Sequence, residues 1–228
     1  EPSYYLPLVP LLPIQTYHGD LDNDQIGLEV NYFSDNMELY FVLSLDEWSP
    51  SLTFTKAHKN WVIWQLGLTQ NNLLFNKDRM TIEYIWSDYR VYKHRFEIND
   101  YYSYGYPLGF WGGPHAELYF LDYKIQLVRN TFVTLSYLSI KKGLTPNEVN
   151  LNKYSDNFYF ERYSEGFEKK DLISLMFSFN LLDKNFDLDL GINYIKWDYP
   201  STNIGYLENG VSVIKNDYFV KVKYELQK

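Results

Sequence analysis

Side chains that could act in catalysis are scattered along this chain of 228 residues. Asp46 and Glu47 are adjacent carboxylates, and neighbouring residues of a β-strand point to opposite faces. They are therefore a poor glycosidase pair, because that chemistry needs two carboxyl groups flanking one bond. We interpret the two carboxylates as contributors to the electrostatics of a lumen or as contacts to a loop.

No established catalytic or metal-binding pattern is present. The chain contains no Gly-x-Ser-x-Gly, phosphate loop or His-Glu-x-x-His motif. Cysteine is absent, which excludes disulfides and thiolate chemistry. Four histidines are spread out without the spacing of metal ligands: His18, His58, His94 and His115. We therefore expect no enzymatic activity, no cofactor and no metal.

The best candidate for binding is the aromatic, glycine-rich stretch from Ile98 to His115. Tyrosine and tryptophan rings can stack on the faces of sugars while their polar edges form hydrogen bonds, and glycine and proline let a loop bend over a ligand. The alternative is that this loop plugs a lumen or packs against neighbouring strands. The glycan-binding hypothesis names Tyr101, Tyr102, Tyr104, Tyr106, Phe110 and Trp111.

Strict alternation of apolar and polar residues surrounds this stretch and predicts β-strands. In residues 186–194, Leu188, Leu190 and Ile192 oppose Asp187 and Asp189. A short polar link, 182–185, joins this run to a similar one at 170–181, as a hairpin requires. The other predicted strands are 25–33, 37–46, 60–70, 78 to as far as 96, 116–128, 131–141, and a last one near the end of the chain. Proline-rich residues 1–24 are expected to be irregular or to form an edge.

The links between these strands alternate in length. Short links fall near 34–36, 71–77, 129–130 and 182–185, and long ones near 47–59, 98–115, 142–169 and 197–215. In an up-and-down antiparallel sheet, every second link lies at the same end, so the pattern predicts short turns at one end and long loops at the other. This asymmetry is typical of a transmembrane β-barrel, and strands of about ten residues fit one. A soluble sandwich or lipocalin-like barrel gives no reason for such segregation.

Barrel architecture suggests roles for several other side chains. We expect a polar lumen network of Asp46, Arg79, Glu83, Asp187 and Asp189. We expect aromatic residues near strand ends on the long-loop side to form an interfacial belt: Trp48, Trp86, Trp197 and Tyr199.

Composition agrees with this class. Aromatic residues make up 19% of the chain, and the net charge is −8, which argues against nucleic acid as a partner. No apolar run approaches the roughly 18 residues of a transmembrane helix.

Four stretches of the sequence resemble the Wzi family of outer-membrane capsule assembly proteins. They are Leu39–Glu47, the pair Trp64–Leu68 and Thr81–Tyr84, the loop Gly105–Ala116, and the Asp-Asn entry at 20–24. The resemblance spans most of residues 20–130. The family pattern would place a histidine or polar residue at Phe110 and an aspartate at His115, and the chain ends in Gln227-Lys228 rather than an aromatic residue.

This resemblance implies a bacterial outer-membrane barrel of more strands than the nine predicted here. It also implies a non-enzymatic role in anchoring or assembling capsule or exopolysaccharide. Because complete bacterial barrels have an even number of strands, we expect residues 1–228 to form one domain that is the C-terminal part of a longer, monomeric barrel in contact with outer-membrane lipid. A general porin or substrate-specific channel is the first alternative, and a soluble lectin-like β protein is the second.

Overall fold

The computed structural model describes residues 25–47, 60–93, 100–144, 159–181, 186–198 and 212–224. Its regular structure consists of strands: β1 (Ile26–Phe33), β2 (Met37–Glu47), β3 (Trp61–Asn71), β4 (Asp78–Ser87), β5 (Tyr102–Ser103), β6 (Tyr106–Pro107), β7 (Ala116–Val128), β8 (Thr131–Gly143), β9 (Phe167–Leu181), β10 (Phe186–Asp198) and β11 (Ser212–Tyr224). No helix in the described part of the chain is long and apolar enough to cross a membrane.

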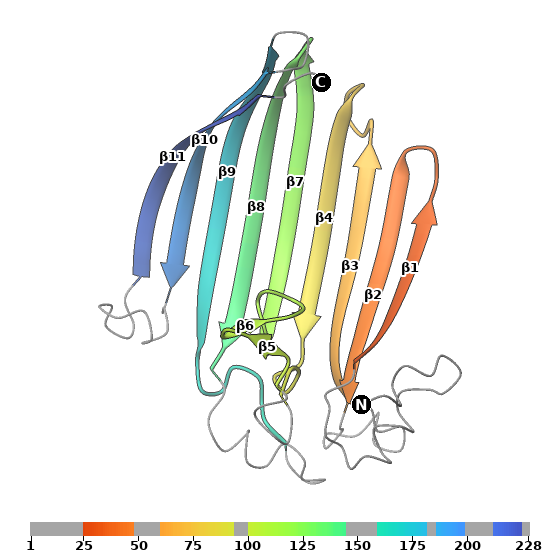
Figure 1. Cartoon of the computed structure of the whole chain (residues 1–228), viewed down its shortest axis with the longest axis vertical. Helices are drawn as coiled ribbons and strands as arrows, with labels where there is room; N and C mark the ends of the chain where they lie inside the picture. Colours follow the sequence, from red (N-terminus) through yellow and green to blue (C-terminus); the bar gives the residue numbers. More distant parts are fainter. Residues whose placement is uncertain are drawn as a thin grey trace.

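Nine of the strands form one sheet, in the order β1-β2-β3-β4-β7-β8-β9-β10-β11 (Figure 1). Every neighbouring pair is antiparallel, so the predicted all-β, up-and-down antiparallel sheet is confirmed. The strand bounds also place the short links at one end of the sheet and the long links at the other. These are called the turn end and the loop end below. Within the described ranges the sheet does not close into a barrel.

One face of the sheet is apolar across its full width. A single row of register partners crosses all nine strands on this face: Tyr32, Leu39, Leu68, Ile82, Leu121, Tyr137, Ile173, Tyr194 and Asn216. These side chains are not buried; Tyr32 is 57% exposed and Ile173 is 43% exposed. Because residues of a strand alternate between faces, the predicted alternation produces a continuous, uncovered apolar surface.

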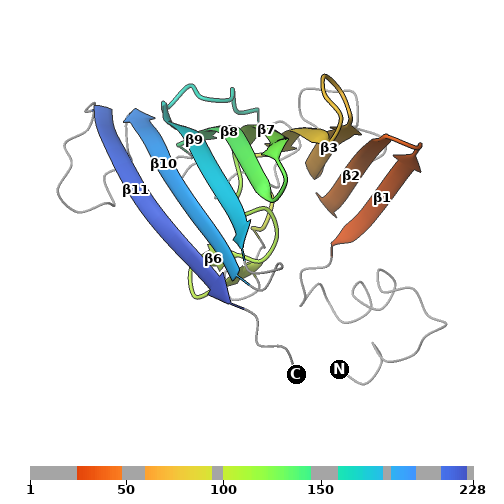
Figure 2. The same ribbon diagram turned by 90° about the horizontal axis from the view of Figure 1, so that it is seen from above.

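The opposite face is polar along the adjacent row. One residue further along each strand, the register partners are Phe33, Glu38, Thr69, Thr81, Asp122, Ser136, Ser174, Asn193 and Asp217. Hydroxyl and carboxylate groups pair across strands here, with Thr69 and Thr81 oxygens 3.1 Å apart and Ser136 donating to Asp122 at 2.5 Å. Figure 2 shows that the sheet is curved, with β6 on the inside of the curve. Tyr102 of β5, the partner of β6, packs against the buried cluster that contains Trp61, and Trp61 lies on the same face of β3 as Thr69. The polar face is therefore concave and the apolar face convex.

The chain after β4 lies against the concave face at the loop end. We call residues 88–93 and 100–115 the inner segment. Although the alternation allowed a strand as far as Phe96, β4 ends at Ser87. The Ser87 hydroxyl donates to Gly113 O at 2.8 Å and accepts from Ala116 N at 3.0 Å, which ties the start of the segment to its end. Residues 94–99 lie outside the described ranges.

Two glycines let aromatic rings lie flat on the concave face. At the register position opposite Tyr40 is Gly67, and a Cβ added there would overlap the Tyr40 ring. The same arrangement joins Gly191 of β10 to Phe219 of β11. Covering an interior strand glycine with a cross-strand ring restores packing that glycine alone cannot provide. The ring of Tyr40 thereby spans β3, and its hydroxyl donates to Glu83 on β4.

Candidate functional site

A small aromatic core fixes the inner segment to the sheet. Trp61, Val91 and Tyr92 are buried together, and Ile63 on β3 packs against them. Tyr92 is held from both ends: its N–H donates to Asp46 Oδ2 at 2.7 Å, and its hydroxyl oxygen accepts from Phe110 N at 2.6 Å. Burial raises the pKa of Tyr92 to about 12, so this phenol is neutral at physiological pH. The segment is thus anchored by β2 and β3 at its base.

A buried ion pair stands at the point where the segment leaves β4. Arg90 donates to both carboxylate oxygens of Asp88, through Nε at 2.8 Å and through Nη2 at 3.0 Å. Each side chain is 3% exposed. The guanidinium also lies 4.6 Å from the Tyr89 ring centroid and 5.7 Å from that of Trp61. A bidentate pair of this kind fixes geometry as well as charge, so it sets the direction in which the chain turns onto the concave face.

The six aromatic residues of the binding hypothesis divide into two groups of three. Tyr101, Tyr102 and Phe110 pack against the buried core. Tyr101 stacks on Tyr92 at 5.8 Å, and Tyr102 meets the same ring edge-on at 6.2 Å. Burial and the Asp100 carboxylate raise the pKa of Tyr102 to about 12. These three rings therefore have the packing role that was the alternative interpretation of the loop.

The other three rings point to solvent from that packed base. Tyr104 is fully exposed, Tyr106 is 74% exposed and Trp111 is 60% exposed. Tyr104 and Gly105 form the tip of the β5–β6 hairpin, both with positive φ, of 49° and 83°. Such a two-residue connection is the favoured hairpin turn, and its geometry holds Tyr104 at the tip. The three exposed rings are available to a ligand without unfolding anything.

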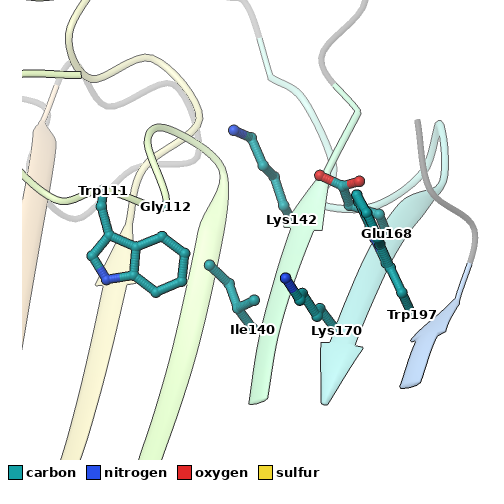
Figure 3. A pocket seen from close by; sticks show the side chains of 7 residues that line it. All are labelled: Trp111, Gly112, Ile140, Lys142, Glu168, Lys170 and Trp197. Atoms are coloured by element: carbon teal, nitrogen blue, oxygen red, sulfur yellow. The ribbon is translucent and has the colours of Figure 1, made fainter. Parts of the chain in front are cut away.

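Trp111 borders a pocket on the concave side at the loop end (Figure 3). The pocket has a volume of about 190 Å³. Its lining comes from the inner segment, β8, β9 and β10: Trp111, Gly112, Ile140, Lys142, Glu168, Lys170 and Trp197. Figure 3 shows the Trp111 indole on one side of the pocket and Lys170, Glu168 and Trp197 on the other.

The pocket combines two indoles with three charged groups. Lys142 lies opposite Glu168 in the β8–β9 register, and Lys170 lies opposite Trp197 in the β9–β10 register. The Lys170 ammonium is 5.3 Å from the centroid of the Trp197 ring, within the range of a cation–π contact. Apolar rings, ammonium donors and a carboxylate acceptor suit a ligand that has both an apolar face and polar substituents.

The predicted lumen residues all lie at concave-face positions of their strands, but they do not form one cluster. Asp46 binds the inner segment through Tyr92, as described, while Glu83 accepts the Tyr40 hydroxyl further towards the turn end. Arg79 is exposed and lies opposite Lys124. Asp187 and Asp189 lie on β10, opposite Lys223 and Lys221 of β11. The polar face therefore contains separate local contacts rather than one network.

A bulge in β2 changes the arrangement predicted for the acidic pair. Leu45 pairs with Val62 and Glu47 with Trp61, so Asp46 is the additional residue at which the register shifts. Simple alternation, which would place the two carboxylates on opposite faces, is interrupted at this point. Alternation from Tyr40 already gives Asp46 a concave-face position, where its carboxylate accepts from Tyr92 N, and the bulge shifts Glu47 to the register position opposite Trp61.

The convex face at the loop end contains an aromatic cluster. Trp64, Tyr84 and Tyr119 contact one another across three strands, with centroid distances of 5.0 and 4.6 Å. Arg162 stacks on Trp86 at 4.6 Å and donates to Ser87 O at 2.7 Å. Of the residues predicted for an interfacial belt, Trp86 is on this face. Trp197 lies an even number of residues from Asp187 and Asp189 on β10, so it is on the concave face, where it lines the pocket. Trp48 and Tyr199 lie outside the described ranges.

His115 is buried where the inner segment enters β7. Its ring stacks on Tyr163 at 5.0 Å with an interplanar angle of 12°, and its Nε2 accepts from Tyr163 N at 3.2 Å. Burial, together with the positive charges of Arg162 and Lys141, lowers the pKa of His115 to about 4. The neutral ring is thus a structural link between the inner segment and residues 159–166.

Two of the seven pocket residues, Lys142 and Glu168, lie outside the strands expected from the sequence. Lys142 and Glu168 were assigned to a link, whereas β8 extends to Gly143 and β9 begins at Phe167. The alternation in β10 was a sufficient signal to place Trp197 on the polar face. Among the residues that the structure describes, no group of three or more acidic residues or histidines could hold a metal ion.

No family model, no curated protein and no solved structure matches the chain.

Proposed function

We propose that this chain forms part of the wall of a transmembrane β-barrel in the bacterial outer membrane, and that it anchors or assembles capsule or exopolysaccharide without enzymatic activity. The convex face meets lipid in this assignment, and the concave face lines the lumen. Long loops lie on the cell surface and short turns on the periplasmic side.

The observation that carries the proposal is the pair of adjacent register rows. Eight of nine positions in one row are apolar or aromatic, and eight of nine in the next are polar. Water-soluble monomers rarely expose apolar patches beyond a few hundred Å². An apolar surface that crosses nine strands, with polar residues on the inside of the curve, is the arrangement of a barrel wall in lipid.

The inner segment supports polysaccharide binding. A buried core and an ion pair hold it against the sheet, and this rigid base presents Tyr104, Tyr106 and Trp111 to solvent. Exposed rings on a fixed support can stack on sugar faces at little entropic cost. The segment occupies the concave side at the loop end, which favours retention of a ligand over free diffusion through a channel. The partial resemblance to Wzi proteins supports the same role.

The experiment compares retention of polysaccharide by bacteria that produce the full-length protein or its variants. Trp111→Ala combined with Tyr104→Ala should increase the fraction of polysaccharide released into the medium several-fold, because two stacking surfaces are lost. Leu108→Ala is the matched control, since Leu108 is in the same segment and is 56% exposed but has no ring. Unchanged retention in the double variant, with normal surface levels of protein, would refute polysaccharide binding. A large single-channel conductance of the purified protein would favour the channel alternative.

A further inference from the structure

We propose that the pocket between Trp111 and Trp197 is a subsite for a pyranose unit bearing one carboxylate, and that it selects acidic over neutral polysaccharide. This inference rests on the proposed function, because it names the substrate class of the same surface. A protein of net charge −8 would on average repel such a chain. An acidic sugar would therefore bind only where positive charge is concentrated locally.

Basic residues are concentrated where β8 ends and β9 begins. Lys141-Lys142 and Lys169-Lys170 are consecutive pairs on adjacent strands. Alternation sends one member of each pair to each face. On the convex side, Lys141 lies over the Tyr163 ring at 3.8 Å, and Lys169 pairs with Asp171 at 3.1 Å.

The other member of each pair, Lys142 or Lys170, lines the pocket. Two ammonium groups and the single carboxylate of Glu168 leave the pocket with one net positive charge. Lys142 extends towards the inner segment, where its Nζ is 3.4 Å from the position that a Cβ on Gly113 would occupy. Lys170 lies beside Trp197. The two cations therefore approach the pocket from different sides, so that a carboxylate inside it can contact either or both.

The remaining lining specifies a sugar rather than a small anion. Trp111 and Trp197 offer indole surfaces to the C–H face of a ring, and Ile140 forms an apolar floor. Glu168 can accept hydrogen bonds from ring hydroxyls. Its negative charge also disfavours ligands with more than one charge per unit, such as a phosphate dianion. The volume of about 190 Å³ is smaller than the roughly 300–1,000 Å³ of pockets for drug-sized ligands, which limits occupancy to one unit of the chain.

The test measures binding of three defined oligosaccharides to the purified full-length protein in detergent: oligogalacturonate, its methyl ester and a sulfated galactan. Titration is followed by tryptophan fluorescence and calorimetry at low and at high salt. We expect oligogalacturonate to bind at least roughly tenfold more tightly than the ester, which has the same rings without charge, and we expect the difference to shrink as salt screens the ammonium groups.

Variants separate the role of charge from the role of stacking. Lys142→Gln with Lys170→Gln should remove most of the preference for the acid over the ester, so that the two ligands bind with similar affinity. Lys124→Gln is the matched control, because Lys124 is a concave-face lysine that lies over Phe132 outside the pocket. Trp111→Ala should weaken both ligands. Strand content by circular dichroism checks that each variant is folded.

The outcomes distinguish this inference from the function on which it rests. Equal binding of acid and ester, lost in Trp111→Ala, would overturn the acidic subsite and leave polysaccharide binding intact. A preference for the acid that survives the double lysine change would place the anion elsewhere and overturn the assignment of the pocket. Tighter binding of the sulfated galactan than of oligogalacturonate would overturn the carboxylate. No binding of any of the three, with unchanged retention of polysaccharide by Trp111→Ala cells, would refute the proposed function as well.

Discussion

Removing one partner of the Asp88–Arg90 pair should release the inner segment from the sheet. In Asp88→Asn the amide keeps the size of the carboxylate but loses its charge, so a guanidinium that is only 3% exposed loses the negative charge of Asp88. Breaking a buried pair by changing one partner typically costs about 3–5 kcal/mol. We place this case within that range because both carboxylate oxygens are used, at 2.8 and 3.0 Å, and both side chains are 3% exposed.

Hydrogen exchange of individual amides measures the free energy that is lost in the inner segment. Three backbone amides report on the docking of the segment: those of Tyr92, Phe110 and His115, which donate to Asp46, to the Tyr92 hydroxyl and to Asp88 O, respectively. A loss of about 3–5 kcal/mol corresponds to exchange that is faster by roughly two to three and a half powers of ten. Amides in the centres of β8 and β9 should keep their protection, because the pair makes no ladder contact there.

A double-mutant cycle tests whether the pair itself is responsible. Arg90→Met alone should also speed exchange, while Asp88→Asn with Arg90→Met should cost at least about 1 kcal/mol less than the sum of the single changes, since neither variant group is charged. Unchanged exchange at the three amides in Asp88→Asn would refute the reasoning. Equal loss of protection in β8 and β9 would show that the pair stabilises the whole sheet rather than the segment.

Packing at Gly67, the protonation of His115 and the environment of each face of β9 can each be tested by substitution. Gly67→Ala should destabilise the fold by about 1–3 kcal/mol, because the new methyl group displaces the Tyr40 ring. The control is Gly27→Ala on β1, where a Cβ meets nothing within 4 Å. Equal urea midpoints for the two variants would contradict this explanation from packing. Because the pKa of His115 is lowered to about 4 from 6.5, the unfolded state binds a proton first as pH falls. Stability should therefore decline between pH 6.5 and 4 by up to roughly 3 kcal/mol, and His115→Gln should remove that part of the decline in denaturant titrations; an identical pH profile would show that His115 does not contribute. In bilayers, a spin label at Ile173→Cys should be accessible to oxygen, and a label at the adjacent Ser174→Cys should be accessible to a water-soluble paramagnetic reagent. The reverse pattern would mean that the convex face is a water-excluded protein core rather than a surface in contact with lipid.

Period-two alternation was enough to define most of the sheet from the sequence. Leu188, Leu190 and Ile192 against Asp187 and Asp189 fix both the strand and its two faces, since each residue advances to the opposite face whatever the neighbouring strands do. Short polar links fix which strands are neighbours, because connections of two to seven residues are too short for the crossover that a parallel pair needs. The bounds of β7, 116–128, agree with the sequence prediction for the same reason.

Alternation fails where the backbone leaves the ladder. Nothing in the local pattern shows that β2 carries a bulge at Asp46, or that Asp88 and Arg90 turn the chain out of β4. The Asp46 carboxylate accepts from the backbone of Tyr92, which is 46 residues away. Ser87, where β4 ends, donates to the backbone of Gly113, which is 26 residues away. Long-range contacts of this kind exist only once the sheet has formed.

The sequence alone determined the fold class, the two chemically different faces and the residue types available for binding. The tertiary structure decided which of those residues work together. It packed Tyr101 and Tyr102 against the buried core, left Tyr104 and Trp111 exposed, and brought Trp197 next to Lys170 and across a pocket from Trp111. The physical reason is that faces follow from local geometry with a fixed period, whereas a pocket is assembled from strands and a loop that meet only through register and packing.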